Sequence, residues 1–245
     1  MSKRSPTQLQ RIKREIRMSG RAGEIITDIV ENGLIFNMDA ANRVSYPKTG
    51  NNCFNTLKIS QTGSLNNGVT LGTNPQNFIF GADGIDDYID FGNIPECNFG
   101  SGNMSVSSWI KTDTIANSNT DIIGIGANGG TRIRLQRRAA RLGGYIDSTS
   151  ANSLTGGTTI NTSNWYNGCI TKVGTTFTIY LNGSADGTVS ISGNFTDTEV
   201  IVGAYFGGGS NYFDGSIGPT QIYNRALSAN EVLHNYNALK ERFGL

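Results

Sequence analysis

The sequence predicts an all-β fold in the form of an antiparallel β-sandwich, and three observations support this. Glycine accounts for 32 of the 245 residues, close to twice the usual share of about 7%, as expected where tight turns are frequent. Several short segments alternate apolar and polar residues, which is the pattern of half-buried strands. The sequence contains no long segment rich in Ala, Leu, Glu and Lys. We therefore expect one sandwich over residues 31–245, preceded by an arm at residues 1–30.

The arm is expected to contain a short helix at residues 6–18, which Pro6 can open and Gly20 can end. Its apolar face consists of Leu9, Ile12 and Ile16, and the basic residues around that face are Arg11, Lys13, Arg14 and Arg17. A helix this short is marginally stable alone. We expect it to order on a partner or on the body of the protein, and its apolar face would also suit a homo-oligomer.

Charge is distributed unevenly along the chain. Residues 1–23 hold seven basic residues and one acid, a net charge of +6, and the remainder holds 13 basic and 18 acidic residues, a net charge of −5. A basic arm suits an acidic protein surface, nucleic acid or an anionic membrane. Because it lacks interleaved aromatic residues, we do not expect specific nucleic-acid recognition. Neither a signal peptide nor an apolar run long enough to cross a bilayer is recognisable, so no membrane insertion is expected.

The expected strands begin at residues 34–38, and residues 40–55 read as an irregular segment. Residues 104–110 alternate around Trp109 and predict a half-buried strand. Further strands are expected at residues 78–80, 85–91, 121–125, 131–136, 141–147, 200–202 and 216–223.

Residues 164–191 give the clearest hairpin signal. Gly174 and Thr175 separate two alternating runs, and Asn182-Gly183 ends the second run with the signature of a type I′ turn. Near the C-terminus, Ser228 followed by Glu231 forms a capping box. The helix that this box starts is expected to carry Leu233, Tyr236 and Leu239.

Four segments, in order, are GADGIDDYIDFG, MSVSSWIK, NWYNGCITKVGTTFTIYLNG and FDGSIGPTQIYNRALSANEV. Together they resemble the laminin-G-like (concanavalin A-like) jelly-roll domains, and the resemblance covers about residues 34–239. It implies a jelly-roll sandwich with a short C-terminal helix. One departure is Pro219, where family members often carry an acidic residue. Proline cannot donate to the ladder, so we expect an edge or a bulge there.

The segment LIFNMDAANRVSYPKTG is similar to a variant of this domain found in bacteriophage and environmental virion proteins. That resemblance implies a non-catalytic virion structural protein, such as a head fibre, a capsid decoration or a tail accessory protein. The arm would anchor it to a capsid or tail protein of the particle. The alternative is a lectin-like module that binds cell-surface glycans.

A glycoside hydrolase of the same fold is the second alternative, and catalytic residues receive little support. Asp197 and Glu199 alternate on one strand and could flank a sugar, but a solvated strand end explains them as well. His234, the single histidine, lies on the expected C-terminal helix. Cys53, Cys97 and Cys169 are widely spaced and are expected to be reduced and packed. We therefore do not expect this protein to be an enzyme.

A calcium site is one interpretation of Asp83, Asp86 and Asp87, which share a glycine-containing turn. Oxygen ligands from a loop suit Ca²⁺, and some members of the family bind it in this way. The other interpretation is structural, because Asp and Gly are favoured turn residues.

The most unusual polar feature is a run of arginines, Arg132, Arg134, Arg137, Arg138 and Arg141. Arg132 and Arg134 alternate with apolar residues and are expected to share the outer face of a strand. Arg137 and Arg138 are expected in the connection that follows. Guanidinium groups suit carboxylates and phosphates, so an anionic glycan or an acidic protein surface could bind there. Salt bridges within the protein are the alternative.

Overall fold

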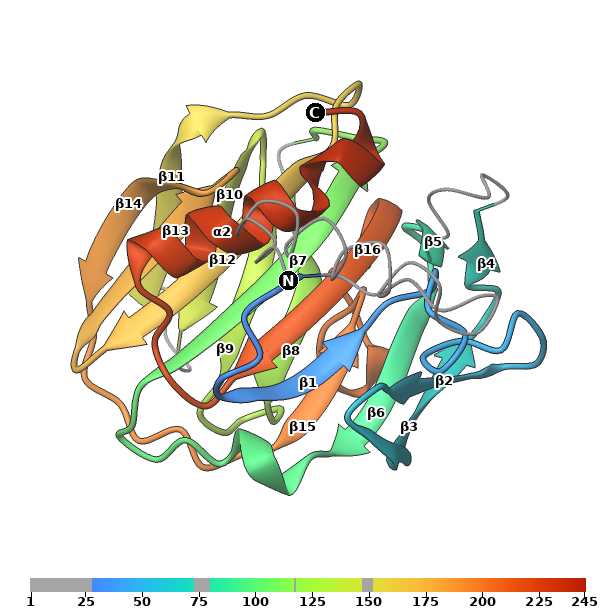
Figure 1. Cartoon of the computed structure of the whole chain (residues 1–245), viewed down its shortest axis with the longest axis horizontal. Coiled ribbons are helices and arrows are strands. Elements are labelled where there is room, and N and C mark those ends of the chain that lie inside the picture. Colours follow the sequence, from blue (N-terminus) through green and yellow to red (C-terminus); the bar gives the residue numbers. More distant parts are fainter. Residues whose placement is uncertain (1–27, 73–79, 117, 147–151) are drawn as a thin grey trace, which may run out of the picture.

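The structure, a computed structural model, describes residues 28–72, 80–116, 118–146 and 152–245. The described residues form two antiparallel sheets of eight strands each, which confirms the predicted sandwich (Figure 1). The predicted helix at residues 6–18 and its apolar and basic residues lie outside the described residues. Within the described part, no helix is long and apolar enough to cross a membrane.

Sheet A contains the predicted hairpin and the strand that carries Trp109. In spatial order its strands are β14 (Ser184–Ser190), β13 (Thr176–Leu181), β12 (Tyr166–Val173), β7 (Met104–Thr112), β16 (Asp214–Tyr223), β5 (Phe80–Asp83) and β4 (Thr70–Leu71), and β1 (Leu34–Met38) also pairs with β16.

Sheet B contains the arginine-rich strand. In spatial order its strands are β11 (Ser153–Thr159), β10 (Arg141–Ile146), β9 (Ile133–Arg138), β8 (Asn119–Gly126), β15 (Glu199–Val202), β6 (Tyr88–Asn93), β3 (Lys58–Asn66) and β2 (Asn52–Asn55). Residues 40–55 are expected to be irregular, but the last four of them form β2. Cys53 and Asn55 are buried there, and β2 pairs with β3 as a hairpin.

The hydrophobic core lies between the two sheets, because alternate side chains of each strand point inward. On β15, Val200 and Val202 belong to the main core, whereas Ile201 packs on the outer side. The three cysteines are free and buried, as predicted, and burial raises the pKa of each thiol to about 12.

Helix α2 (Ala229–Leu239) lies across part of the outer face of sheet A, in front of β12, β13 and β7 (Figure 1). Its start confirms the predicted capping box of Ser228 and Glu231. Trp109, on β7, stacks against two aromatic residues of the C-terminal segment, with ring centroids 5.5 Å from Tyr236 and 4.3 Å from Phe243.

One of the buried residues of α2 is polar. Val232, Asn235 and Leu239 are buried, whereas Leu233 is 43% exposed. Asn235 can face the sheet because both ends of its amide are satisfied there. Its Oδ1 accepts from the backbone of Val30 at 2.8 Å, and its Nδ2 donates to the Tyr223 hydroxyl at 2.9 Å.

Pro219 lies inside β16, at the point where this strand changes partner. The first half of β16 pairs with β5 and the second half with β1, and the register with β7 shifts between Ile217 and Thr220. The expectation of an edge or a bulge is confirmed, and because β16 is central the interruption takes the form of a bulge. A residue without an N–H fits a central strand only where the ladder is interrupted.

Candidate functional site

A polar hollow opens beside β4, β5 and the first residues of β16. Its volume is about 400 Å³. The polar residues that line it are Asn67, Thr70, Asp83, Asp87, Asp113 and Ser216. Four glycines complete most of the remaining wall, so the backbone itself is open to a ligand.

The glycine at position 215 shows why this wall has no side chain there. Gly215 has φ +137°, and an added Cβ would lie 2.2 Å from the carbonyl oxygen of Lys111. Both the backbone conformation and the contact with β7 require glycine at this position.

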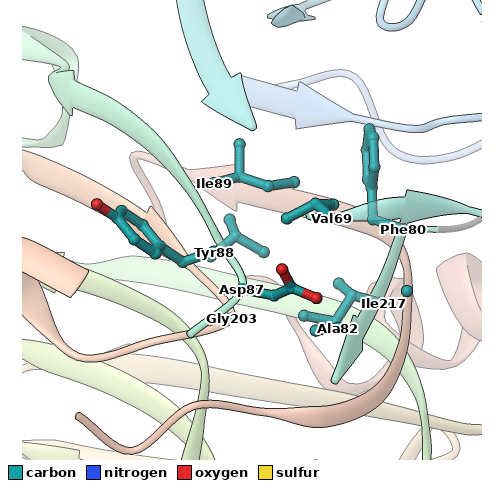
Figure 2. A pocket seen from close by; sticks show the side chains of 10 residues that line it. Val69, Phe80, Ala82, Asp87, Tyr88, Ile89, Gly203 and Ile217 are labelled. Atoms are coloured by element: carbon teal, nitrogen blue, oxygen red, sulfur yellow. The ribbon is translucent and has the colours of Figure 1, made fainter. Parts of the chain in front are cut away.

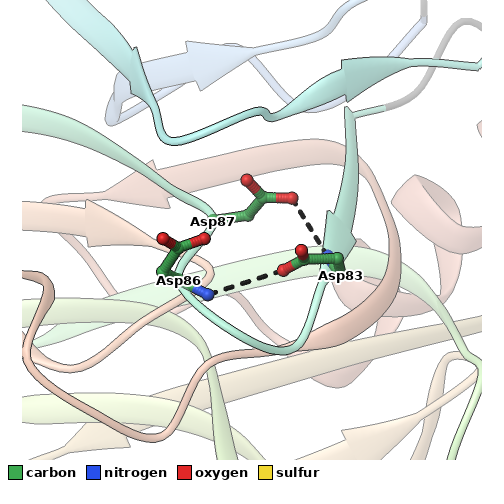
Figure 3. A group of neighbouring side chains, drawn as sticks. All are labelled: Asp83, Asp86 and Asp87. Atoms are coloured by element: carbon green, nitrogen blue, oxygen red, sulfur yellow. Dashed lines mark hydrogen bonds between the residues drawn. The ribbon is translucent and has the colours of Figure 1, made fainter.

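The β5–β6 turn supplies the acidic side of the hollow, and Figure 3 shows how its three carboxylates converge. Asp83 Oδ1 accepts from the backbone of Ile85 at 2.9 Å, and Asp87 Oδ2 accepts from the backbone of Asp83 at 3.1 Å. These bonds fit the structural interpretation of the turn. One oxygen from each of Asp83, Asp86 and Asp87 lies within 4.8 Å of the others, so the structure brings the three predicted residues together.

Asp87 differs from its two neighbours because it is buried, with a relative exposure of 3%. It also borders a small apolar cavity of about 10 Å³ whose lining includes Val69, Phe80 and Ile217 (Figure 2). Burial raises the pKa of the Asp87 carboxyl, and the charges of Asp83 and Asp86 raise it further, while the hydrogen bond from Asp83 lowers it. Its Oδ1 atom has no hydrogen-bond partner among the described residues.

The arginine run lies on β9 and around it. The structure corrects one prediction: Arg137 and Arg138 belong to β9 rather than to a connection. The turn to β10 is only two residues long, and Ala139 enters it with φ +49°. The strand therefore continues to Arg138, and its alternation separates the arginines.

Arg132 and Arg134 lie on the face of sheet B that points away from the core, as predicted. Arg134 Nη1 donates to Asp121 Oδ2 at 2.7 Å, and its guanidinium carbon lies 4.4 Å from the ring centre of Tyr145 and 4.9 Å from that of Tyr205. Arg132 Nη1 donates to the Tyr205 hydroxyl at 2.5 Å. Both guanidinium groups are thus held between tyrosine rings.

Asp121 is fully buried and is the acid at the centre of this arrangement. Besides Arg134, Gln136 Nε2 donates to it at 2.7 Å and Asn211 Nδ2 at 3.4 Å. Burial raises the pKa of Asp121, and the positive charge of Arg134 together with these hydrogen bonds opposes that rise. The salt-bridge interpretation is therefore correct for Arg134.

Arg137 points to the opposite side of β9 and is fully buried. Its Nη1 donates to the carbonyl oxygens of Ala116, Ser118 and Ala139 at 3.0–3.2 Å, so it ties the β7–β8 connection to the β9–β10 turn. Arg138 is half-buried and Arg141 is exposed. The outer face thus gathers four of the five arginines, and anion binding there stays a prediction.

The two acids considered for glycoside hydrolysis have different surroundings. Asp197 Oδ2 accepts from the backbone of Thr131 at 2.9 Å and from its hydroxyl at 3.3 Å, so it holds the β8–β9 loop. Burial raises the pKa of Glu199, and the nearby Asp90 adds to this effect. His234 is exposed on α2, and its Nε2 lies 2.7 Å from the carbonyl oxygen of Asp28.

Three solved structures illustrate the similarity of the fold. Trypanosoma rangeli sialidase in complex with sialic acid matches with a TM-score of 0.65 and 13% identity, over 97% of this chain and 40% of the sialidase. Domain 4 of AbnA, a GH43 extracellular arabinanase from Geobacillus stearothermophilus, in complex with arabinotriose, matches with a TM-score of 0.64 and 16% identity, over 84% of this chain and 100% of the domain. The binding domain of Paraclostridial Mosquitocidal Protein 1 matches with a TM-score of 0.66 and 15% identity, over 84% of this chain and 52% of that one.

At these identities the likeness shows the fold, and the chain spans only about 40% of the sialidase. A sequence comparison with curated proteins gives no match. Residues 83–233, well over half of the chain, match the family described as the Concanavalin A-like lectin/glucanases superfamily. The four segments that resemble this family in the sequence lie on β5–β6, β7, β12–β13 and β16–α2. The chain therefore belongs to the Concanavalin A-like lectin/glucanases superfamily.

Proposed function

We propose that the protein is a non-catalytic carbohydrate-binding module that holds a glycan in the polar hollow. The observation that carries this proposal is the composition of the hollow, in which three carboxylates, one amide and two hydroxyl groups surround a volume of about 400 Å³. Sugar hydroxyls both donate and accept hydrogen bonds, and this set offers both functions. The volume falls within the range of about 300–1,000 Å³ that is typical of small-molecule sites.

The similarity of fold supports the proposal in a general way. Domain 4 of the arabinanase has been solved in complex with arabinotriose, so a domain of this fold can accommodate a sugar. The glycines of the hollow add to this, because Gly68 and Gly81 leave the backbone accessible beside Asn67 and Thr70. We expect a ligand rich in hydroxyl groups to contact both side chains and backbone there.

The test is a glycan array with the full chain, followed by isothermal titration calorimetry of the best ligand. Asp113→Asn and Ser216→Ala alter polar groups of the hollow, and each is expected to weaken binding at least about tenfold. Glu241→Gln, an exposed acid of the C-terminal 3-10 helix, is the matched control and should bind like the wild type. Failure to bind any glycan, or unchanged binding by both hollow variants, would refute the proposal.

We also propose that the protein is displayed on a virus particle, with the arm as its anchor. Support comes from the +6 charge of residues 1–23 against the −5 charge of the remainder and from the resemblance of residues 34–50 to virion proteins. Deletion of residues 1–23 should abolish co-sedimentation with the particle and leave the thermal unfolding of the body unchanged. Attachment retained after this deletion would contradict the anchor. Display and glycan binding are compatible with each other.

Glycoside hydrolysis is tested separately. We expect no release of reducing sugars from polysaccharides by the wild-type chain. Turnover that disappears on Asp197→Asn or Glu199→Gln substitution would overturn the non-catalytic assignment.

A further inference from the structure

We propose that Arg138 and Arg141 form the centre of a second binding site, which holds the carboxylate of a uronic acid glycan on the outer face of sheet B. Both arginines lie on the hairpin of β9 and β10, in a different sheet from the strands that border the polar hollow. Glycan binding in the hollow is not required for this second site, which depends on positive charge that the described residues leave uncompensated.

The outer face of β9 and β10 carries more positive than negative charge. Arg132, Arg134 and Arg138 follow the alternation of β9, and Arg141 joins them because it pairs directly with Arg138. The pairing of β8 with β9 places one carboxylate, that of Asp121, on the same face. Arg134 forms a salt bridge with it at 2.7 Å, and within the described part of the chain the other three arginines form none.

Two of these three arginines are within reach of a ligand. Arg132 is buried, with a relative exposure of 8%, and its guanidinium is covered by Tyr205. Arg138 is half-buried and Arg141 is exposed. An anion from solvent would therefore meet the guanidinium groups of Arg138 and Arg141 first.

The guanidinium of Arg138 is oriented before any ligand binds. Its Nη1 donates to Gln136 Oε1 at 2.8 Å and its Nε donates to Thr155 Oγ1 at 3.2 Å. Gln136 is itself fixed, because its Nε2 donates to Asp121 at 2.7 Å. Gly143 makes room for this arrangement, since a Cβ added there would lie 2.7 Å from Arg138 Cδ. Nη2 makes no hydrogen bond to the described residues, and a donor held in place in this way loses little entropy on binding.

Arg141 stands directly opposite Arg138 in the ladder of β9 and β10. Residues in such a pair have Cα atoms about 4.5–5.5 Å apart and point to the same face, where like charges destabilise the pairing. Burial lowers the pKa of Arg138, and the charge of Arg134 lowers it further, while Asp121 and Tyr145 oppose this. A carboxylate placed between the two guanidinium groups would offset their repulsion and could accept hydrogen bonds from both.

The surroundings of the two arginines suit an acidic sugar better than an acidic peptide. β10 pairs with β9 on one side and with β11 on the other, so this face offers no open strand edge to which a peptide backbone could add. Thr155 and Thr159 of β11 are exposed and stand opposite Gly143 and Arg141. Their hydroxyl groups can pair with sugar hydroxyls. We expect the carboxylate of a uronic acid at the arginines and its ring hydroxyls at the threonines.

The experiment is calorimetric titration of the full chain with oligomers of galacturonic acid and of glucuronic acid. We expect saturable binding of at least one of them in about 20 mM NaCl, and a Kd several-fold higher in about 150 mM NaCl, where charges are screened more strongly. The methyl ester of the same oligomer keeps the sugar and removes its charge, and it should bind at least about tenfold more weakly.

Four variants locate the site. Arg141→Gln changes an exposed side chain that makes no hydrogen bond or ion pair within the described residues, so the fold should be unaffected and the Kd should rise at least about tenfold. Arg138→Gln should have a similar effect. Arg43→Gln, which removes an equal charge from an exposed position between β1 and β2, should bind like the wild type. Asp113→Asn alters the hollow and should also leave uronate binding unchanged.

Wild-type affinity in both Arg141→Gln and Arg138→Gln would overturn the proposal, as would equal binding of the methyl ester. Absence of heat with both uronate oligomers at about 1 mM, the weakest affinity worth calling a site, would overturn it as well. If poly-glutamate of equal charge binds as tightly as the oligomers, the assignment to a sugar is wrong. A neutral glycan whose binding depends on Asp113 and not on Arg141 would support the hollow alone, so the two sites can fail independently.

Discussion

Replacement of Asp121 by Ala tests whether the pair formed by Arg134 and Asp121 holds the outer face of sheet B together. The substitution removes the acceptor of the 2.7 Å ion pair and leaves the Arg134 guanidinium with no carboxylate partner. The side chain of Arg134 is only 7% exposed and that of Asp121 is fully buried. Water therefore cannot replace the missing acceptor without rearrangement.

Breaking a buried ion pair from one side costs about 3–5 kcal/mol in the free energy of unfolding. Three features of this pair support a value in that range. Gln136 and Asn211 each lose the acceptor of a hydrogen bond, and Arg134 Nε has no partner among the described residues even before the substitution. For a chain of this size, 1 kcal/mol corresponds to about 2–4 °C, so the Tm should fall by about 6–20 °C.

The assay is urea unfolding followed by tryptophan fluorescence, with thermal unfolding as a second measurement. A paired variant, Asp121→Leu with Arg134→Met, is the control because it removes both charges. It should recover most of the loss, since apolar replacement of a buried pair is often close to neutral. If Asp121→Ala costs less than about 1 kcal/mol, the pair behaves like an exposed salt bridge and the reasoning fails.

Three further outcomes are expected from the described contacts. Ser228→Ala should lower the free energy of unfolding in urea by about 1 kcal/mol, because the first turn of α2 loses its cap. Arg225 lowers the pKa of Glu231 from 4.5 to about 2. The pair should therefore stabilise the folded protein fully above about pH 4.5, and this stabilisation should be lost as the pH falls towards 2. In Arg225→Leu, the Tm measured by thermal unfolding should depend less on pH over that window. Gly215→Ala should destabilise the protein by more than about 2 kcal/mol, measured in urea, because the new Cβ would meet the Lys111 carbonyl at 2.2 Å.

Local signals predicted the parts of the fold that depend on local chemistry. The hairpin of β12 and β13, the cap of α2 and the bulge at Pro219 each follow from one residue or a few residues close in the sequence, and all three are confirmed. The strand pair β2 and β3 gave no such signal. On β3 the buried positions are Gln61 and Gly63. Burial alternates along this strand, but the buried residues are not apolar side chains, so the sequence shows no alternation of apolar and polar residues there.

The arginine run shows how a strand boundary changes the interpretation of a site. Five arginines within ten residues looked like one basic patch. Once β9 extends to Arg138, the same alternation that places Arg132 and Arg134 outside also places Arg137 towards the core. Its hydrogen bonds to three backbone carbonyls then give it a structural role. The predicted end of the strand was therefore wrong, whereas the predicted alternation of its side chains was correct.

The polar hollow could be predicted only in part. The turn that carries Asp83 and Asp87 was recognisable from its acids and glycine. Asn67, Asp113 and Ser216 come from separate parts of the chain. The pairing of β16 with β5 and β7 brings Ser216 and Asp113 to this place, and the pairing of β4 with β5 brings Asn67. Because that pairing is long-range, the spacing of residues along the sequence carries no signal for it.

The two polar surfaces differ in charge, and this allows their ligands to be separated. The hollow presents carboxylates, whereas the outer face of β9 and β10 presents Arg138 and Arg141 beyond the paired Arg134. The hollow lies beside β4, β5 and β16 of sheet A, whereas β9 and β10 belong to sheet B. A neutral glycan bound in the hollow should show little dependence on salt, whereas an anionic ligand on β9 should be weakened strongly between low and physiological ionic strength. The salt dependence of the affinity of the first ligand found would therefore show which of the two surfaces binds that ligand, before any variant is made.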